Sequence, residues 1–83
     1  MTRKRIDEWL EDRGLSTLLA DGLDGAFLGV DENDGAVRAV YSIEECIRIL
    51  SEDMSPEEAE EYFWYNTAGA YVGEQTPLFI HTP

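Results

Sequence analysis

The spacing of apolar residues near the N-terminus predicts a short amphipathic helix over residues 3–13. Ile6, Trp9 and Leu10 fall on one face at i, i+3 and i+4 spacing, and Gly14 is placed to end the helix. The Arg-Lys-Arg run at its start opposes the helix dipole, because positive charge is unfavourable at a helix N-terminus. We therefore expect the first turn to fray or to serve as an attachment arm.

A β-hairpin is predicted after a connector rich in Asp and Gly at residues 15–25. Residues 26–30 and 36–41 have the short apolar runs that are typical of strands. The segment between them is Asp-Glu-Asn-Asp-Gly, and its Asp34-Gly35 pair supplies the positive φ angles that a tight hairpin turn needs. The two strands are therefore expected to pair antiparallel.

Two helices are predicted next, and each begins with a capping box, in which a Ser hydroxyl and a Glu carboxylate satisfy backbone donors at the helix start. The first opens at Ser42, and the second opens at Ser55 with Pro56 at its first helical position. The apolar stripe of the first helix is Ile43, Cys46, Ile47 and Leu50. The inner face of the second is expected to be Ala59, Tyr62, Phe63, Asn66 and Ala70, with Gly73 at its end.

A short third strand is predicted at residues 78–80, directly after Pro77 breaks the chain. Helices joined by only a few residues pack antiparallel, and here they would cover one face of a sheet. The sequence therefore predicts an α+β fold: a small antiparallel sheet, formed by the hairpin and the C-terminal strand, packed by a helix pair, with an additional N-terminal helix. We expect one domain over residues 1–83, with helix and connector at 1–20 and the α+β core at 21–81.

Charge is the outstanding feature of the composition. Eighteen Asp and Glu stand against six Lys and Arg, which gives a net charge of −12. This charge opposes direct binding to nucleic acid or to an anionic membrane, and it suits a basic partner. The same acidity would also suit a cytoplasm with molar salt, where the Debye length shrinks to about 3 Å and repulsion fades. Composition alone does not separate these two interpretations.

The single cysteine, Cys46, excludes a disulfide within the chain, and a secreted domain this small would usually carry several. It lies on the inner face of its helix and is expected to be a small core residue. The basic N-terminus is followed by charged rather than apolar residues, which predicts neither a signal peptide nor a transmembrane span. We therefore expect a cytoplasmic protein.

Residues 66–77 form the distinctive run Asn-Thr-Ala-Gly-Ala-Tyr-Val-Gly-Glu-Gln-Thr-Pro. With this run as its most specific part, the chain over roughly residues 21–80 resembles a family of small uncharacterised proteins from bacteriophages, prophages and microbial genomes. The first predicted strand is similar as well. Many members have a further basic residue and a Gly before the position of Met54, where this chain has Ser51-Glu52-Asp53. The family implies no established activity, and the N-terminal helix lies outside it.

Carboxylates and aromatic residues supply the candidate partner-binding groups. One exposed helix face is expected to present Glu57, Glu58, Glu60 and Glu61, either as a plain solvated surface or as a mimic of a phosphate backbone. Four consecutive aromatic residues follow and must point around more than half of the helix, so Trp64 or Tyr65 is expected to be exposed or covered by a partner, the N-terminal helix or a second copy. Glu74 is expected in an exposed loop that could contact a partner.

Asn66 falls between Phe63 and Ala70 on the predicted apolar face. A buried amide without partners costs about 1–3 kcal/mol, so Asn66 is expected to be a structural polar residue that holds nearby backbone.

The sequence lacks the pattern of an enzyme or of a metal site. His81 is the only histidine and lies near the end of the chain, so neither a multi-histidine metal site nor a Ser-His-Asp triad is expected. A calcium loop that starts at Asp31 would need Gly at its sixth position and Glu at its twelfth, where the chain has Ala36 and Ser42. We expect no catalytic residue, no metal and no cofactor.

These observations predict a non-enzymatic protein that acts by protein–protein contact. With the viral resemblance, the most concrete hypothesis is an inhibitor of a host defence or nucleic-acid-binding protein, acting through its acidic surface. The alternative is a structural or accessory protein that forms homo-oligomers and whose acidity is salt adaptation.

Overall fold

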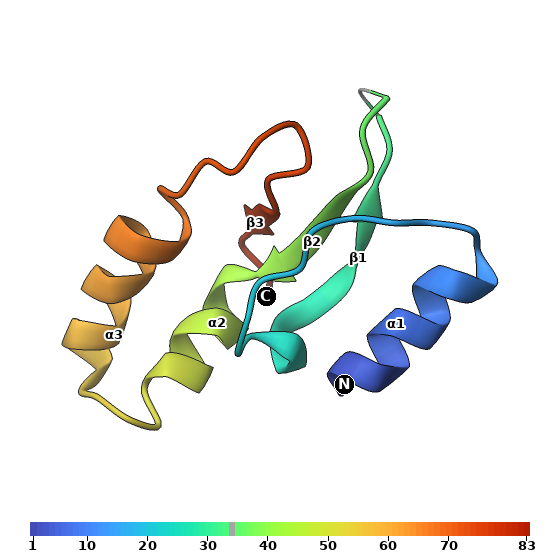
Figure 1. Cartoon of the computed structure of the whole chain (residues 1–83). Helices are drawn as coiled ribbons and strands as arrows, with labels where there is room; N and C mark the ends of the chain where they lie inside the picture. The colour runs from blue at the N-terminus through green and yellow to red at the C-terminus, as the bar shows by residue number, and fades with distance from the viewer. Residues whose placement is uncertain (34) are drawn as a thin grey trace.

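The computed structural model describes residues 1–83 except Asp34 and has the predicted α+β architecture, with three α-helices and a three-stranded mixed sheet (Figure 1). Helix α1 (Arg3–Asp12) leads through a long connector to the 3-10 turn η1 (Asp24–Ala26) and the hairpin of β1 (Phe27–Asp31) and β2 (Arg38–Ser42). Helices α2 (Ile43–Leu50) and α3 (Pro56–Tyr62) follow, then the π-helical turn η2 (Phe63–Thr67) and β3 (Leu78–Ile80). In Figure 1, α1 lies on one side of the sheet strands and the α2–α3 pair on the other.

The sheet has the order β1-β2-β3, with β1 and β2 antiparallel as predicted and a bulge at Leu28, between the paired residues Phe27 and Gly29. The prediction of an antiparallel sheet throughout is wrong, because β3 pairs parallel to β2. Arg38, at the start of β2, donates its Nε hydrogen to the Thr76 carbonyl at 2.6 Å. This bond joins the start of β2 to the residues just before β3, in agreement with the parallel register of the two strands. The expected turn at Asp34 lies outside the described residues.

Both predicted N-caps are confirmed. The Ser42 hydroxyl accepts a hydrogen bond from the Glu45 backbone N–H, and the Ser55 hydroxyl accepts one from Glu58 N–H, each at 3.2 Å. A helix leaves the backbone N–H groups of its first turn without partners, and an N-cap Ser accepts one of them. In both places the Ser therefore indicates the helix start.

Aromatic rings form a continuous row through the core. Phe27, Tyr41 and Phe79 occupy neighbouring register positions on the three strands, with ring centroids 5.7 Å apart in each adjacent pair. Trp9 of α1 packs edge-on against Phe27, and Phe63 packs edge-on against Phe79, so the row connects α1 with α3.

Cys46 is buried beside this row, as predicted. Burial raises the pKa of its thiol to about 12, so the group remains a neutral core side chain.

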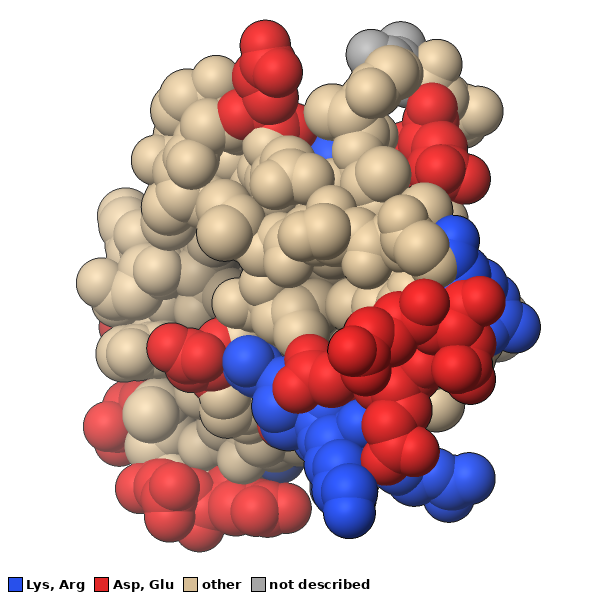
Figure 2. Space-filling model, turned by 45° about the vertical axis from the view of Figure 1, so that its right-hand side comes forward, with Lys and Arg blue, Asp and Glu red and all other residues tan. Residues whose placement is uncertain are grey.

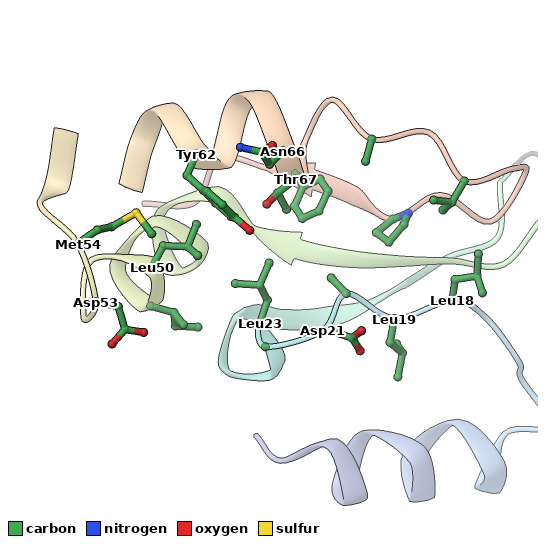
Figure 3. Close-up of a pocket in the computed structure, with 17 residues that line it drawn as sticks. Leu18, Leu19, Asp21, Leu23, Leu50, Asp53, Met54, Tyr62, Asn66 and Thr67 are labelled. Carbon is green, nitrogen blue, oxygen red and sulfur yellow. The ribbon is translucent and has the colours of Figure 1, made fainter. Parts of the chain in front are cut away.

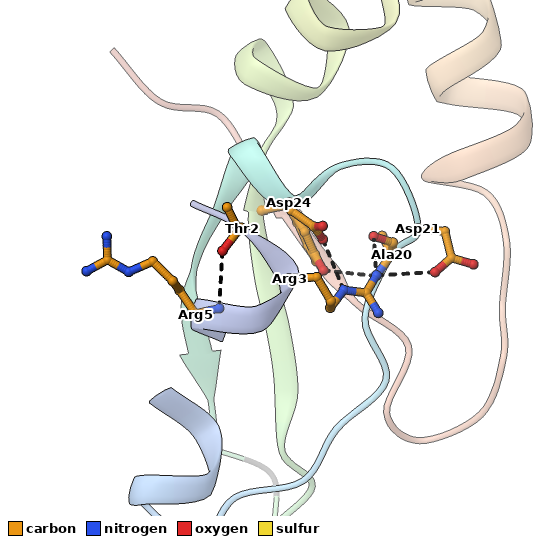
Figure 4. A network of polar contacts seen from close by, with 7 residues as sticks. Thr2, Arg3, Arg5, Ala20, Asp21 and Asp24 are labelled. Carbon is orange, nitrogen blue, oxygen red and sulfur yellow. Dashed lines mark hydrogen bonds and ion pairs between the residues drawn. The ribbon is translucent and has the colours of Figure 1, made fainter. Parts of the chain in front are cut away.

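Helix α1 is docked on the core rather than acting as a frayed arm. Ile6 and Leu10 are buried, and the Thr2 hydroxyl caps the helix by accepting from Arg5 N–H. Arg3 turns its guanidinium away from the helix end and donates to the carboxylates of Asp24 and Asp21, each at 3.2 Å (Figure 4). The expected conflict with the helix dipole is therefore relieved by tertiary ion pairs.

Replacing Arg3 with Met should destabilise the protein by about 0.5–1 kcal/mol, because partly exposed ion pairs contribute little individually. The measurement is a double-mutant cycle with Asp24→Asn in urea unfolding. A coupling free energy indistinguishable from zero would show that Arg3 does not hold α1 through Asp24.

The π-helical turn changes which residues of the last helix face the core. In η2 the backbone N–H of Ala68 bonds to the carbonyl of Phe63, five residues earlier, so the helix is wider than an α-helix. Phe63 is buried and Ala68 packs against the core, whereas the predicted inner residues Tyr62, Asn66 and Ala70 are exposed. The structural role predicted for Asn66 is therefore wrong. The expected helix end at Gly73 is also wrong, because η2 ends at Thr67.

The C-terminal segment is held to the start of α2 by Glu44. Its carboxylate lies 2.7 Å from His81 Nδ1 and accepts the Thr82 backbone N–H at 2.7 Å. The contact with His81, and then that with Thr82, lower the pKa of Glu44 from 4.5 to about 2.

This carboxylate is thus more acidic in the folded state, and its contribution to stability is present above pH 4.5 and lost as the pH falls towards 2. Wild-type protein should be more stable than Glu44→Gln at neutral pH. This difference in unfolding free energy should vanish as the pH falls from 4.5 towards 2. Chemical unfolding at a series of pH values measures it. A difference that does not depend on pH would contradict the role of the charge.

Candidate protein-binding site

The outer face of α3 is acidic and makes no ion pair with any described residue. Glu57, Glu58, Glu60 and Glu61 are all exposed, as predicted. Among these four carboxylates, only that of Glu58 has a hydrogen-bond partner in the described part of the chain, the hydroxyl of the capping Ser55. The carboxylates of α3 are therefore available to a partner.

The neighbouring helix uses its carboxylates differently. In α2, Glu44 holds the C-terminal segment, and Arg48 pairs with Glu45 at 2.7 Å and with Glu52 at 3.8 Å. The difference has a basis in the sequence, because α2 contains Arg48 and α3 contains no Lys or Arg. The structure thus separates an internally paired acidic helix from an unpaired one.

Charge is distributed unevenly along the chain. Arg3, Lys4, Arg5 and Arg13 lie in or just after α1, whereas no Lys or Arg occurs from Ile49 to the C-terminus. On the face in Figure 2, basic side chains gather in the region of α1 and are interleaved with carboxylates. From Ile49 onward the chain therefore carries carboxylates and no Lys or Arg of its own.

The two aromatic candidates follow directly after α3 and are both exposed, which confirms that part of the prediction. Tyr65 is 83% exposed, whereas Trp64 is 45% exposed and packs edge-on against Phe63 with ring centroids 5.0 Å apart. A large ring that is held on one side and open on the other is preorganised for contact, since little side-chain freedom remains to be lost.

An apolar groove of about 500 Å³ lies between α3 and the connector (Figure 3). Tyr62, Asn66 and Thr67 form one wall, and the connector residues Leu18–Leu23 form the other. Met54 and Leu50 lie at one end. Asn66 is exposed at this wall, and Thr67 and Ala70, which also line the groove, are small.

A shallower hollow adjoins the groove on the acidic side of α3. It shares Met54, Tyr62 and Asn66 with the groove, and its other lining residues are Glu58, Glu61 and Tyr65. Two predicted carboxylates and one predicted aromatic residue are thus brought around one depression.

The remaining candidate does not join this group. Glu74 lies in the loop before β3, next to Gly35 and Ala36 of the hairpin, and shares no cavity with the α3 carboxylates. Sequence reasoning also missed the groove wall at residues 18–23. Its only sequence signal was the pair Leu18-Leu19 in a segment otherwise rich in Asp and Gly.

Among the residues that the structure describes, no group of three or more His, Cys, Asp or Glu could hold a metal ion. No described helix has the length and apolar character needed to cross a membrane.

Comparison with known proteins gives no match to a family model, a curated protein or a solved structure. The resemblance to phage and microbial proteins therefore stays a prediction.

Proposed function

We propose that the chain is a non-enzymatic binding protein that takes a basic protein partner on the outer face of α3. The observation that carries this proposal is the unpaired carboxylate face, directly followed by exposed Trp64 and Tyr65. Several exposed carboxylates elsewhere are balanced by a nearby basic group, as Asp21 is by Arg3 and Glu45 by Arg48. On α3 no such balance exists within the described chain.

The two kinds of side chain would play different roles in binding. Unscreened carboxylates accelerate encounter with a basic protein and exclude acidic competitors, but rim charges add modest affinity. Trp and Tyr supply most of the binding free energy where they become fully covered. The combination favours a fast, salt-sensitive complex anchored by Trp64 and Tyr65.

In its most concrete form, the partner is a nucleic-acid-binding protein in the cytoplasm, and the α3 face occupies the groove that would otherwise bind phosphates. An inhibitor of this kind fits the resemblance to phage proteins. It needs no cofactor, no metal and no catalytic residue.

Affinity capture from a lysate of the source cells, with elution by a salt gradient, tests the proposal. A basic nucleic-acid-binding protein should be captured and should be released as salt rises, because screening weakens the attraction between the charged surfaces. Recovery of only the protein itself at every salt concentration would contradict it.

That outcome would favour the second candidate, a structural homo-oligomer whose acidity is salt adaptation. The observation in its favour is the exposure of Tyr62, Trp64, Tyr65, Tyr71 and Val72 within one stretch of the chain. Such a protein would gain stability with added potassium chloride and would bind no basic partner.

A further inference from the structure

The groove between α3 and the connector has an apolar rim. A small molecule bound inside the groove would not cover this rim, which would stay exposed to water. Leu18 stands on the connector wall and is 44% exposed, and Tyr62 on the opposite wall is exposed as well. Val72, which also lines the groove, is a further exposed large side chain. Contiguous exposed apolar surface of this kind marks sites where another protein binds. A segment of polypeptide laid along the groove would cover this rim as well as the interior.

The adjoining hollow is lined by aromatic and acidic residues together. The aromatic residues are Tyr62 and Tyr65, and the acidic residues are Glu58 and Glu61. Aromatic faces together with negative charge bind an ammonium or guanidinium group, through cation–π attraction and charge pairing. Because the two cavities share Met54, Tyr62 and Asn66, one segment can fill both at once.

We infer that the groove and the hollow form one docking site for a basic amphipathic segment of the partner. Its large apolar side chains enter the groove, and a neighbouring Arg or Lys enters the hollow. This inference rests on the proposed function and names the part of the partner that the α3 face recognises.

Charge complementarity identifies the occupant as basic. Asp21 and Asp53 line the groove, Glu58 and Glu61 line the hollow, and neither cavity is lined by a Lys or Arg. Arg3 reaches Asp21 from α1, but Asp53, Glu58 and Glu61 have no basic partner in the described chain. A second copy of this chain would bring further negative charge to this surface, so it is a poorer occupant than a basic segment.

The test uses a labelled designed peptide of Leu and Lys, with leucines at i, i+3, i+4 and i+7, and measures binding by fluorescence anisotropy. Leu18→Arg should weaken binding about tenfold or more, because it removes an apolar contact and places a cation in the path of the lysines. Leu28→Arg is the matched control: Leu28 is 52% exposed and lies on β1, outside both cavities, so its replacement should change affinity by less than about twofold.

A second pair of variants, which remove the same charge, tests the hollow. Glu61 lines the hollow, whereas Glu11 is an exposed residue of α1 that lines neither cavity. Glu61→Gln should weaken binding of the Leu/Lys peptide about three- to tenfold, and Glu11→Gln about twofold or less. These variants keep the inference testable if Leu18→Arg disturbs the fold, which circular dichroism would detect.

The outcomes separate this inference from the proposed function. If the two variants of each pair change the affinity for the peptide equally, the docking site is wrong. If neutralising the whole α3 face still abolishes partner binding, the proposed function stands. Equal binding of a Leu/Glu peptide with the same spacing would overturn the basic character of the occupant. Binding of a small apolar dye that the Leu/Lys peptide fails to displace would assign the groove to a small ligand and would also overturn the inference.

Discussion

Phe63→Ala is expected to cost about 3–5 kcal/mol of unfolding free energy, the largest stability loss predicted for this protein. The ring is fully buried and packs edge-on against Phe79 with centroids 5.2 Å apart, so truncation leaves a cavity at the junction of α3 and the sheet. A domain of 83 residues has a total stability of about 4–12 kcal/mol. The variant should therefore unfold at a much lower urea concentration than the wild-type protein.

The adjacent aromatic residues provide the control for this prediction. Tyr65 is 83% exposed, and its replacement by Ala should change stability by less than about 0.5 kcal/mol. A loss below about 1 kcal/mol for Phe63→Ala would show that Phe63 is not the link between the last helix and the aromatic row.

Neutralising the α3 face should have the largest effect on partner binding. The triple variant Glu57→Gln, Glu60→Gln and Glu61→Gln removes three exposed charges and keeps Glu58, which takes part in the cap of α3. Affinity for the captured basic partner should fall roughly 10- to 100-fold, and its dependence on salt should become less steep. Isothermal titration at two salt concentrations measures both quantities.

A matched variant on α1 separates the location of the charges from their number. Glu8→Gln, Glu11→Gln and Asp12→Asn also remove three exposed carboxylates, but near the basic residues of α1. Affinity should change much less in this variant. Equal losses in the two triple variants would mean that net charge alone attracts the partner, and the α3 face would lose its special role.

Secondary structure could be predicted wherever its determinants are local. Ser42 and Ser55 each carry the side chain that caps the helix they start, and the apolar run at residues 78–80 follows a proline. The direction of β3 could not be predicted, because β3 pairs with a strand far from it in the chain, where Arg38 contacts the Thr76 carbonyl across 38 residues. Local patterns contain no information about such a contact.

The candidate site was predicted only in part for the same reason. Exposure of the α3 carboxylates and of Trp64 and Tyr65 follows from their positions on a helix that can bury one side only. The prediction for Asn66 assumed an α-helical period, but Phe63–Thr67 form a π-helical turn. No residue type in this segment indicates a π-helical turn. The groove escaped prediction because its walls, at residues 18–23 and on α3, meet only in the folded chain.

The two tryptophan indole N–H signals in a nitrogen-15 correlation spectrum test the central claim most directly. Trp64 follows the acidic face of α3, whereas Trp9 lies on α1 between Phe27 and the guanidinium of Arg13. On addition of the captured basic partner, the Trp64 signal should shift or broaden together with the amides of α3, and the Trp9 signal should stay in place. A shift of Trp9 with no change at Trp64 would place the interface on α1 and contradict the account.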